Sequence, residues 1–210
     1  MATGDLVGDL SGDLGGGLAG DLQTVADRLR RRDAVVLIDG RSGAGKSTFA
    51  DRLVASWPGP TRPVLVRMDD VYPGWGGLDA ASEHVQRELL APRSTGGSGR
   101  WRRHDWVTGR PAEWNDVPAD RPLVLEGCGS LSRAGAAVAD VRIWLDADEA
   151  TRKRRALARD AGAFDDHWDM WTDQMEAFVA RERPLALADV VLRSDGGTAH
   201  GWLDGLVRSR

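Results

Sequence analysis

The sequence predicts an α/β fold in which a five-stranded parallel sheet carries helices on both faces. Short runs of β-branched and aliphatic residues alternate with stretches in which apolar residues follow helical spacing. The first run, residues 35–39, leads directly into a glycine-rich turn and a helical pattern. Acidic residues follow two later runs, at the sheet edge where ligands of such folds bind. These three observations together favour a nucleotide-binding α/β protein.

The elements are expected in a simple order along the chain. Strands are predicted at residues 35–39, 64–68, 123–126, 141–145 and 190–192 because each run is short, apolar and bounded by turn residues. Helices are predicted at 18–31, 46–57, 79–90, 149–161, 166–179 and 201–207, with Pro184 ending the helical spacing before the last strand. Residues 92–99 are expected to form a loop, and 100–122 an irregular segment rich in tryptophan and arginine.

Composition limits the function classes. The formal net charge is −4, so no global basic field favours a nucleic-acid partner. No apolar run approaches the ~20 residues that a membrane span needs. The N-terminus has no basic start followed by an apolar core, so a cytoplasmic location is expected. Cys128 is the single cysteine, which excludes an internal disulfide and favours a small buried thiol.

The first residues differ in composition from the rest. The triplet Gly-Asp-Leu recurs from Gly4, Gly8, Gly12 and Gly20, and such a segment has little apolar surface to offset the entropy lost on ordering. Residues 1–17 are therefore predicted to be a disordered tail and 18–210 a single domain. A calcium-binding repeat is a weaker interpretation because the spacing is irregular. The role of the tail stays open.

The glycine-rich turn has the pattern G-x-x-x-x-G-K-S from Gly40 to Ser47, which is typical of a phosphate-binding loop. Glycines let the backbone close around a phosphate, and the amides form an anion nest at a helix N-terminus. Lys46 would reach the β- and γ-phosphates, and the Ser47 hydroxyl would bind Mg²⁺. A glycine-rich linker is the competing interpretation, and the flanking strand and helix oppose it. Nucleotide contacts are expected from Gly40, Ser42, Gly43, Ala44, Gly45, Lys46, Ser47 and Thr48.

Two carboxylates stand out at predicted strand ends. Asp69 follows the second strand and Glu126 ends the third. A carboxylate near a phosphate loop can hold Mg²⁺ or accept a proton from an attacking hydroxyl. Asp69 could instead be a simple turn former. An idle glutamate in a buried strand would be costly, which favours a functional Glu126.

Five short motifs recur in an order that resembles a known family. They are Asp69-Asp70-Val71-Tyr72, His104-Asp105-Trp106, Glu126-Gly127, the series Arg152, Arg155, Arg159 and Asp160, and Ala188-Asp189-Val190-Val191-Leu192. In this order they resemble the uridine kinase-like group of P-loop kinases, which includes pantothenate kinase and phosphoribulokinase. The resemblance covers residues 34–197, and its specificity lies in the order and spacing of the motifs.

This resemblance implies a P-loop kinase architecture with a short arginine-bearing lid, and ATP and Mg²⁺ as cofactors. It implies that Asp69 is the general base and that Lys46, Arg152 and Arg155 act on the transferring phosphate. The spacing of the lid arginines Arg152, Arg155 and Arg159 places all three on one helix face. The resemblance further implies nucleotide contact by Arg159, metal ligands Ser47, Asp69 and Glu126, and acceptor contacts by Tyr72, His104, Asp105 and Trp106.

The acceptor side departs from the family pattern. Gly109 stands where nucleoside kinases carry a base-recognising histidine, and 79–82 replaces their Asp-His-Pro-Asp segment. The acceptor is therefore expected to differ from uridine. Tryptophans could stack on a flat or sugar-like acceptor and arginines could bind an anion, or they could be ordinary core and surface residues. These residues are Trp75, Trp101, Trp106, Trp114, Arg100, Arg102, Arg103 and Arg110.

Together these patterns predict an ATP-dependent kinase that phosphorylates a hydroxyl of a small-molecule acceptor. A nucleoside monophosphate kinase is the first alternative. Asp69 distinguishes the two, because a hydroxyl acceptor needs a base whereas a phosphate acceptor needs none at neutral pH. A P-loop NTPase switch or motor is the second, and the chain lacks the Asn-Lys-x-Asp motif that reads guanine. A non-catalytic nucleotide-binding protein is the third. The acceptor, the preference for ATP over GTP and the oligomeric state stay open.

Overall fold

The computed structural model describes residues 25–159, 162 and 164–194. The described chain begins with a helical turn at residues 25–29. The elements that follow are β1 (Val35–Asp39), α2 (Lys46–Ala55), β2 (Val64–Arg67), the 3-10 helix η1 (Met68–Asp70), α3 (Leu78–His84), the π-helix η2 (Val85–Leu90), α4 (Ala91–Ser94), β3 (Gly99–Asp105), β4 (Arg110–Val117), β5 (Leu123–Glu126), α5 (Arg133–Ala136), β6 (Val141–Asp146), α6 (Glu149–Arg159), the 3-10 helix η3 (Asp165–His167), α7 (Trp168–Glu182), α8 (Pro184–Leu187) and β7 (Val190–Arg193).

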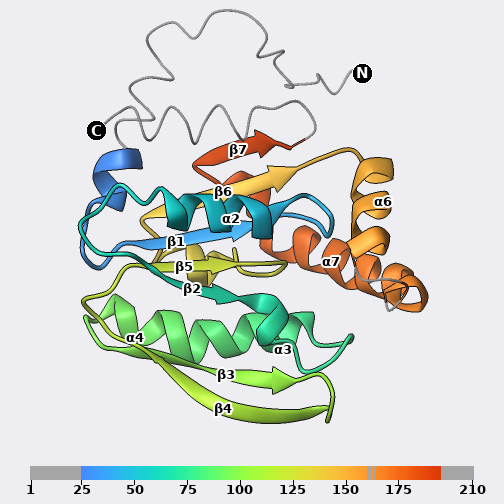
Figure 1. The fold of residues 1–210 in the computed structure, drawn as a ribbon, viewed down its shortest axis with the longest axis horizontal. Helices are drawn as coiled ribbons and strands as arrows, with labels where there is room; N and C mark the ends of the chain where they lie inside the picture. The colour runs from blue at the N-terminus through green and yellow to red at the C-terminus, as the bar shows by residue number, and fades with distance from the viewer. Residues whose placement is uncertain (1–24, 160–161, 163, 195–210) are drawn as a thin grey trace, which may run out of the picture.

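The main sheet has five strands in the order β2-β5-β1-β6-β7, as the strands in Figure 1 show. Each neighbouring pair is parallel. The central register pairs Val36 of β1 with Val124 of β5 and Val141 of β6. The prediction of a five-stranded parallel sheet is confirmed, and the five predicted strands lie within one residue of their observed bounds.

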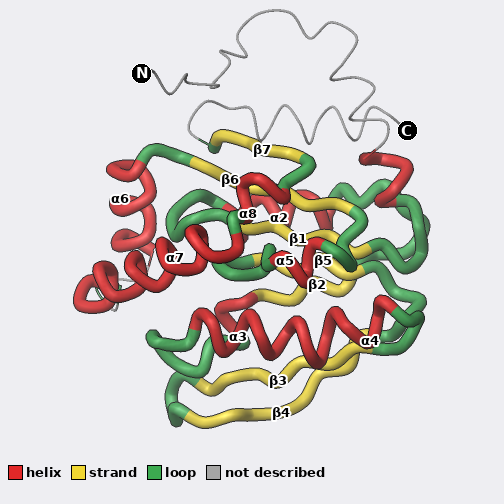
Figure 2. Tube along the Cα trace, turned by 180° about the vertical axis from the view of Figure 1, so that it is seen from behind, coloured by secondary structure: helices red, strands yellow, loops and turns green. Residues whose placement is uncertain are grey.

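Helices cover both faces of this sheet, as predicted. Alternate residues of β1 enter two separate cores because successive strand side chains point to opposite faces: Val36 and Ile38 pack with α2, and Leu37 packs on the other side. The second core includes buried side chains of α3, α5 and α7. Figure 1 shows α2 in front of the strands, and Figure 2, seen from behind, shows α5, α7 and α8 on the opposite face.

The segment 100–122 is not irregular, and this prediction was wrong. Strands β3 and β4 form an antiparallel hairpin with a register shift between Arg102 and His104. The turn is held by Asp105, whose Oδ1 accepts hydrogen bonds from the backbone N–H groups of Val107 (2.9 Å) and Thr108 (3.3 Å). Most side chains of the hairpin are exposed or half-buried, so the period-2 pattern of a half-buried strand is weak here.

The helix boundaries also differ from expectation. The helix predicted to end at residue 90 continues to Ser94, and η2 widens it to π spacing on the way. Pro92 is tolerated because it lies in the first turn of α4. Short helices α5 and α8 were not expected, and α8 begins at Pro184. The helix predicted at 201–207, the predicted tail 1–17 and the first half of the predicted helix 18–31 lie outside the described residues.

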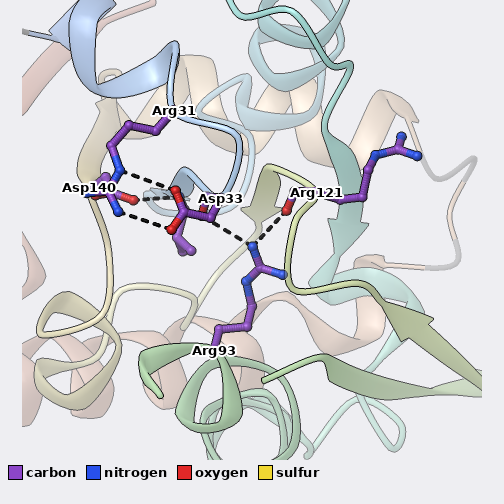
Figure 3. Close-up of polar contacts among 6 residues, drawn as sticks. Arg31, Asp33, Arg93, Arg121 and Asp140 are labelled. Carbon is purple, nitrogen blue, oxygen red and sulfur yellow. Dashed lines mark hydrogen bonds and ion pairs between the residues drawn. The ribbon is translucent and has the colours of Figure 1, made fainter. Parts of the chain in front are cut away.

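Arg93 of α4 ties the hairpin region to the amino-terminal ends of the strands. Its Nη1 donates to the carbonyl oxygen of Pro118 (2.8 Å), and its Nη2 donates to those of Arg121 (2.7 Å) and Asp33 (3.3 Å). Figure 3 shows this guanidinium between the segments that lead into β1 and β5. The contact fixes the sheet at the end opposite to the glycine-rich loop.

No helix within the described ranges combines the length and the apolar character that crossing a membrane requires.

Candidate active site

The glycine-rich loop between β1 and α2 has a backbone that only glycine accommodates at key positions. Gly43 has φ +79°, and a Cβ there would lie 2.0 Å from the carbonyl oxygen of Arg152. At Gly40 a Cβ would lie 2.1 Å from the carbonyl oxygen of Leu145. Gly45 precedes α2 in the left-handed conformation. The loop is therefore packed against β6 and α6, and its amides lie at the N-terminus of a ten-residue helix.

Lys46 is buried and its ammonium group folds back on the loop. Nζ donates to the carbonyl oxygens of Gly40 (2.7 Å) and Arg41 (3.1 Å) and to Cys128 Sγ (3.3 Å). Burial acts to lower the pKa of Lys46, but electrostatic interactions with Cys128, Glu126, Asp39 and Asp69 outweigh burial and raise the pKa above its ordinary value. The lysine is therefore a fixed positive charge in the loop at all physiological pH values.

A cavity of about 280 Å³ opens between this loop and the carboxyl ends of the strands. It brings together four segments that are distant in the sequence: the loop with the start of α2, the turn after β2, the end of β5, and α6. The lining residues are Ser42, Gly43, Gly45, Lys46, Ser47, Thr48, Asp69, Glu126, Gly127, Cys128, Arg155 and Ala156. Of the other predicted loop contacts, Gly40 and Ala44 are buried behind this surface.

The cavity wall carries two carboxylates and a hydroxyl. Glu126 is almost fully buried, and its Oε1 accepts a hydrogen bond from Arg67 (3.1 Å). Burial raises the pKa of Glu126, and Asp69 adds to this effect, whereas Lys46, Arg67 and a hydrogen bond from Ser47 oppose it. Among the described residues no group of three or more His, Cys, Asp or Glu side chains is gathered for a metal ion. Any cation site here would therefore combine these two carboxylates with the Ser47 hydroxyl.

The side chains of Asp69 and Asp70 lie in different surroundings, although the two residues do not belong to a strand, in which neighbouring side chains would point to opposite faces. Strand β2 ends at Arg67, and both aspartates belong to the 3-10 helix η1. Asp69 is exposed and lines the cavity, whereas Asp70 is half-buried and does not line it. Burial, and next the Asp69 charge, raise the pKa of Asp70. The strand predicted at residues 64–68 therefore ends one residue early, because the backbone turns into η1 at Met68.

Asp39 is a buried acid that the motif analysis did not single out. Its Oδ1 accepts hydrogen bonds from the backbone N–H of Gly40 (2.7 Å) and Gly129 (3.2 Å), and its Oδ2 accepts one from Leu131 (2.9 Å). Complete burial raises the pKa of Asp39 to about 6, although these bonds and Lys46 favour the ionised form. Asp39 thus joins the first residue of the phosphate loop to the segment after β5. The sequence feature that could have pointed to Asp39 is an acidic residue at the end of an otherwise apolar strand.

The lid arginines occupy different environments. Arg152 is buried beneath the loop, and it donates to the carbonyl oxygens of Ala147 (3.2 Å) and Ser42 (3.4 Å). Burial lowers the pKa of Arg152. Arg155 lines the cavity and donates to Ser194 Oγ (2.9 Å). The side chain of Arg159 lies outside the described residues. Figure 1 shows α6, which carries all three, beyond the carboxyl end of β6.

The chain was compared with known proteins. No protein-family model and no curated protein matches it. Among solved structures it is similar to one described as a possible uridine kinase from Bacillus stearothermophilus, with a TM-score of 0.52 and 18% sequence identity. The match covers 83% of this chain and 98% of the other. The chain has a uridine kinase-like P-loop kinase fold. At this level of identity the likeness concerns the fold alone.

Within this P-loop kinase fold, two residues expected at the acceptor have structural contacts instead. Tyr72 is 2% exposed, and its hydroxyl donates to the carbonyl oxygen of Cys128 (2.7 Å). Asp105 caps the hairpin turn with its carboxylate. Both side chains are therefore occupied in holding backbone segments, because each satisfies donors or acceptors that the chain itself leaves open. These contacts account for both side chains without a substrate.

The other two residues, His104 and Trp106, belong to an aromatic cluster that reaches Asp69 through Trp106. His104 is 8% exposed and packs edge-on against the ring of Trp106, with centroids 5.5 Å apart. Trp106 is 42% exposed, and its indole Nε1 donates to the backbone carbonyl oxygen of Asp69 (2.8 Å). Trp75 contacts Trp106 at 5.1 Å and stacks on His167 at 4.6 Å. An aromatic cluster thus borders Asp69 on the side of the hairpin.

Proposed function

We propose that the chain is an ATP-dependent kinase that transfers the γ-phosphoryl group to a hydroxyl of a small molecule. One observation carries this proposal. Asp69 presents an exposed carboxylate to the wall of the cavity that the phosphate loop forms, and among the described residues no cation forms an ion pair with it. A hydroxyl acceptor needs such a base, whereas a phosphate acceptor at neutral pH does not.

The donor side would be bound by the loop. Its amides and the N-terminus of α2 favour an anion. Lys46 would exchange its bonds to the Gly40 and Arg41 carbonyl oxygens for bonds to phosphate oxygens, which are stronger because both partners are charged. Arg155, which also lines the cavity, would supply a second positive charge to the bound phosphates.

The residues on the cavity wall fit Mg²⁺. Ser47, Asp69 and Glu126 offer a hydroxyl and carboxylate oxygens, which are the ligands that this ion prefers. When bound, the ion would neutralise charge on the phosphate oxygens. The Arg67 guanidinium, which bridges Glu126 and Asp51, favours the ionised form of Glu126 and so keeps it suitable for a cation.

The step itself is a direct displacement. The acceptor oxygen forms a bond to the γ-phosphorus, the bond from that phosphorus to the bridging oxygen breaks, and ADP leaves with the bridging oxygen. Asp69 takes the proton of the acceptor hydroxyl. The enzyme contributes mainly position and charge, because phosphoryl transfer needs little covalent help.

The acceptor is expected to be uncharged or cationic at its contact with the hairpin. Two arginines that could have bound an anionic acceptor are already paired: Arg100 with Glu88 (3.2 Å) and Arg103 with Glu113 (2.7 Å). Asp70 adds negative charge beside the proposed base. An acceptor phosphate would therefore meet little free positive charge from Arg100 and Arg103, which favours an alcohol acceptor over a nucleoside monophosphate.

The experiment compares Asp69→Asn with the matched variant Asp70→Asn. ATP consumption with Mg²⁺ is measured against a panel of nucleosides, sugars, amino alcohols, vitamins and their phosphates, with slow ATP hydrolysis as the reference. Asp69→Asn should lower kcat by roughly 10²–10⁴ with ATP affinity little changed, because only the base is removed. Asp70→Asn should have a much smaller effect. A severe loss in Asp70→Asn with a mild one in Asp69→Asn would reverse the roles of the two. Preferential phosphorylation of a phosphate acceptor without need of either would refute the proposal.

A further inference from the structure

The backbone carbonyl of Asp69 has an unusual position in its turn. In η1 the carbonyl oxygen of Met68 accepts from the N–H groups of both Val71 (2.8 Å) and Tyr72 (3.0 Å). The next carbonyl, that of Asp69, would need the N–H of Tyr72 or of residue 73. Tyr72 is already used, and Pro73 has no N–H. The turn therefore leaves the Asp69 carbonyl without a backbone donor from the residues that follow it.

Trp106 supplies the missing donor from a different part of the fold. Its Nε1 lies 2.8 Å from the Asp69 carbonyl oxygen, across 37 positions of sequence. The indole N–H is the single polar group of this side chain and can only donate. Because that group is used on the backbone, Trp106 has only its ring face to offer to an acceptor.

The donor is held in place before any ligand binds. The Trp106 ring packs against His104 on the same hairpin and against Trp75 in the segment after η1. Trp75 is itself fixed, because its carbonyl oxygen accepts from Gln174 Nε2 (2.9 Å) and its ring stacks on His167. The hairpin turn beneath Trp106 is closed by the Asp105 carboxylate. An indole supported on several sides is a rigid anchor rather than a mobile surface residue.

We propose that Trp106 is a positioning residue that fixes the direction of the Asp69 carboxylate by clamping the backbone carbonyl of the same residue. The clamp restricts the torsion between the Asp69 Cα and its carbonyl carbon, and with it the Cα–Cβ direction. This inference rests on the proposed role of Asp69 as the proton acceptor. A small misalignment of such a group is costly, because a displacement on the order of 1 Å can reduce a rate by about 10²-fold.

The first test measures the clamp itself, independently of activity. Trp106→Phe keeps an aromatic ring and removes the donor. Trp114→Phe is the matched control, because Trp114 lies on the same hairpin, is also 42% exposed, and packs against the guanidinium of Arg100 at 4.3 Å, away from η1. Amide hydrogen exchange of Val71 and Tyr72 should become about fivefold faster in Trp106→Phe, the factor expected for one ordinary hydrogen bond. Exchange rates unchanged from wild type, or equally raised in the control, would overturn the proposal.

The second test asks whether Trp106 acts through Asp69. ATP hydrolysis with Mg²⁺, with water as acceptor, is measured for Trp106→Phe, Asp69→Asn and the double variant. Trp106→Phe should lower kcat about tenfold with the dissociation constant of ATP within about twofold of wild type, and should cause no further loss in the Asp69→Asn background. Additive losses would show that Trp106 acts elsewhere and would overturn the inference. Full activity of Asp69→Asn would instead refute the role of Asp69, while the exchange measurement still decides whether the clamp exists.

Discussion

Protonation of Asp39 is expected to stabilise the fold, so the effect of Asp39→Asn should depend on pH. The carboxyl is fully buried and its pKa is raised from 3.8 to about 6, with burial as the main cause. Between these values the folded chain binds more protons at this site than the unfolded chain does. The contribution of Asp39 to stability therefore falls as pH rises from about 4 to about 6 and is level above that window.

The magnitude follows from the two pKa values. Compared with a side chain that stays protonated in both states, the titration of Asp39 lowers the free energy of unfolding by roughly 1.5 kcal/mol at pH 5 and roughly 3 kcal/mol at pH 7.5. Asparagine is neutral at both pH values. It also replaces one acceptor by a donor facing a backbone N–H, which costs about 1–3 kcal/mol regardless of pH. The free-energy difference between wild type and variant should therefore shift by roughly 1.5 kcal/mol toward the variant between pH 5 and pH 7.5.

The assay is urea unfolding of both proteins at pH 5 and pH 7.5. Asp33→Asn serves as the control, because a hydrogen bond from Arg31 lowers the pKa of Asp33 and its titration lies below both pH values. The free-energy difference between wild type and this control should be the same at the two pH values. If the difference for Asp39→Asn is equally flat, or shifts toward wild type at pH 7.5, the reasoning from burial is refuted.

Two further predictions concern the loop. Lys46→Ala should lower phosphoryl transfer by roughly 10²–10³ because one preorganised positive charge is lost, while Lys153→Ala, the control at the only other lysine, should leave transfer unchanged. Near-normal turnover of a folded Lys46→Ala variant would exclude the loop as the active phosphate site. Cys128 lines the cavity but is 4% exposed, so alkylation should be slow and should slow further when ATP and Mg²⁺ are present. Equal labelling rates with and without nucleotide would contradict the placement of the nucleotide beside Cys128.

The sequence by itself determined the main sheet and the phosphate loop. Residues 35–39 were recognisable as a buried strand because four apolar residues and an aspartate directly precede a glycine-rich turn. Short apolar runs bounded by turn residues likewise located the other four strands. Parallel strands of an α/β fold end at one edge, so Asp69 and Glu126 could be expected near the loop, and both line one cavity with it. These inferences succeed because period and turn chemistry act over a few neighbouring residues.

The tertiary structure decided what depends on contacts between distant segments. The hairpin of β3 and β4 was missed because its exposed, polar strands lack a strong local pattern, and its pairing partner is what makes it a strand. Asp39 could be recognised as a brace only once Gly129 and Leu131 were seen to bring their N–H groups to it. The bond from Trp106 to the carbonyl of Asp69 joins residues 37 positions apart. No local pattern encodes such a bond. Every buried carbonyl needs a hydrogen-bond donor, but the packing of the whole chain decides which residue supplies it.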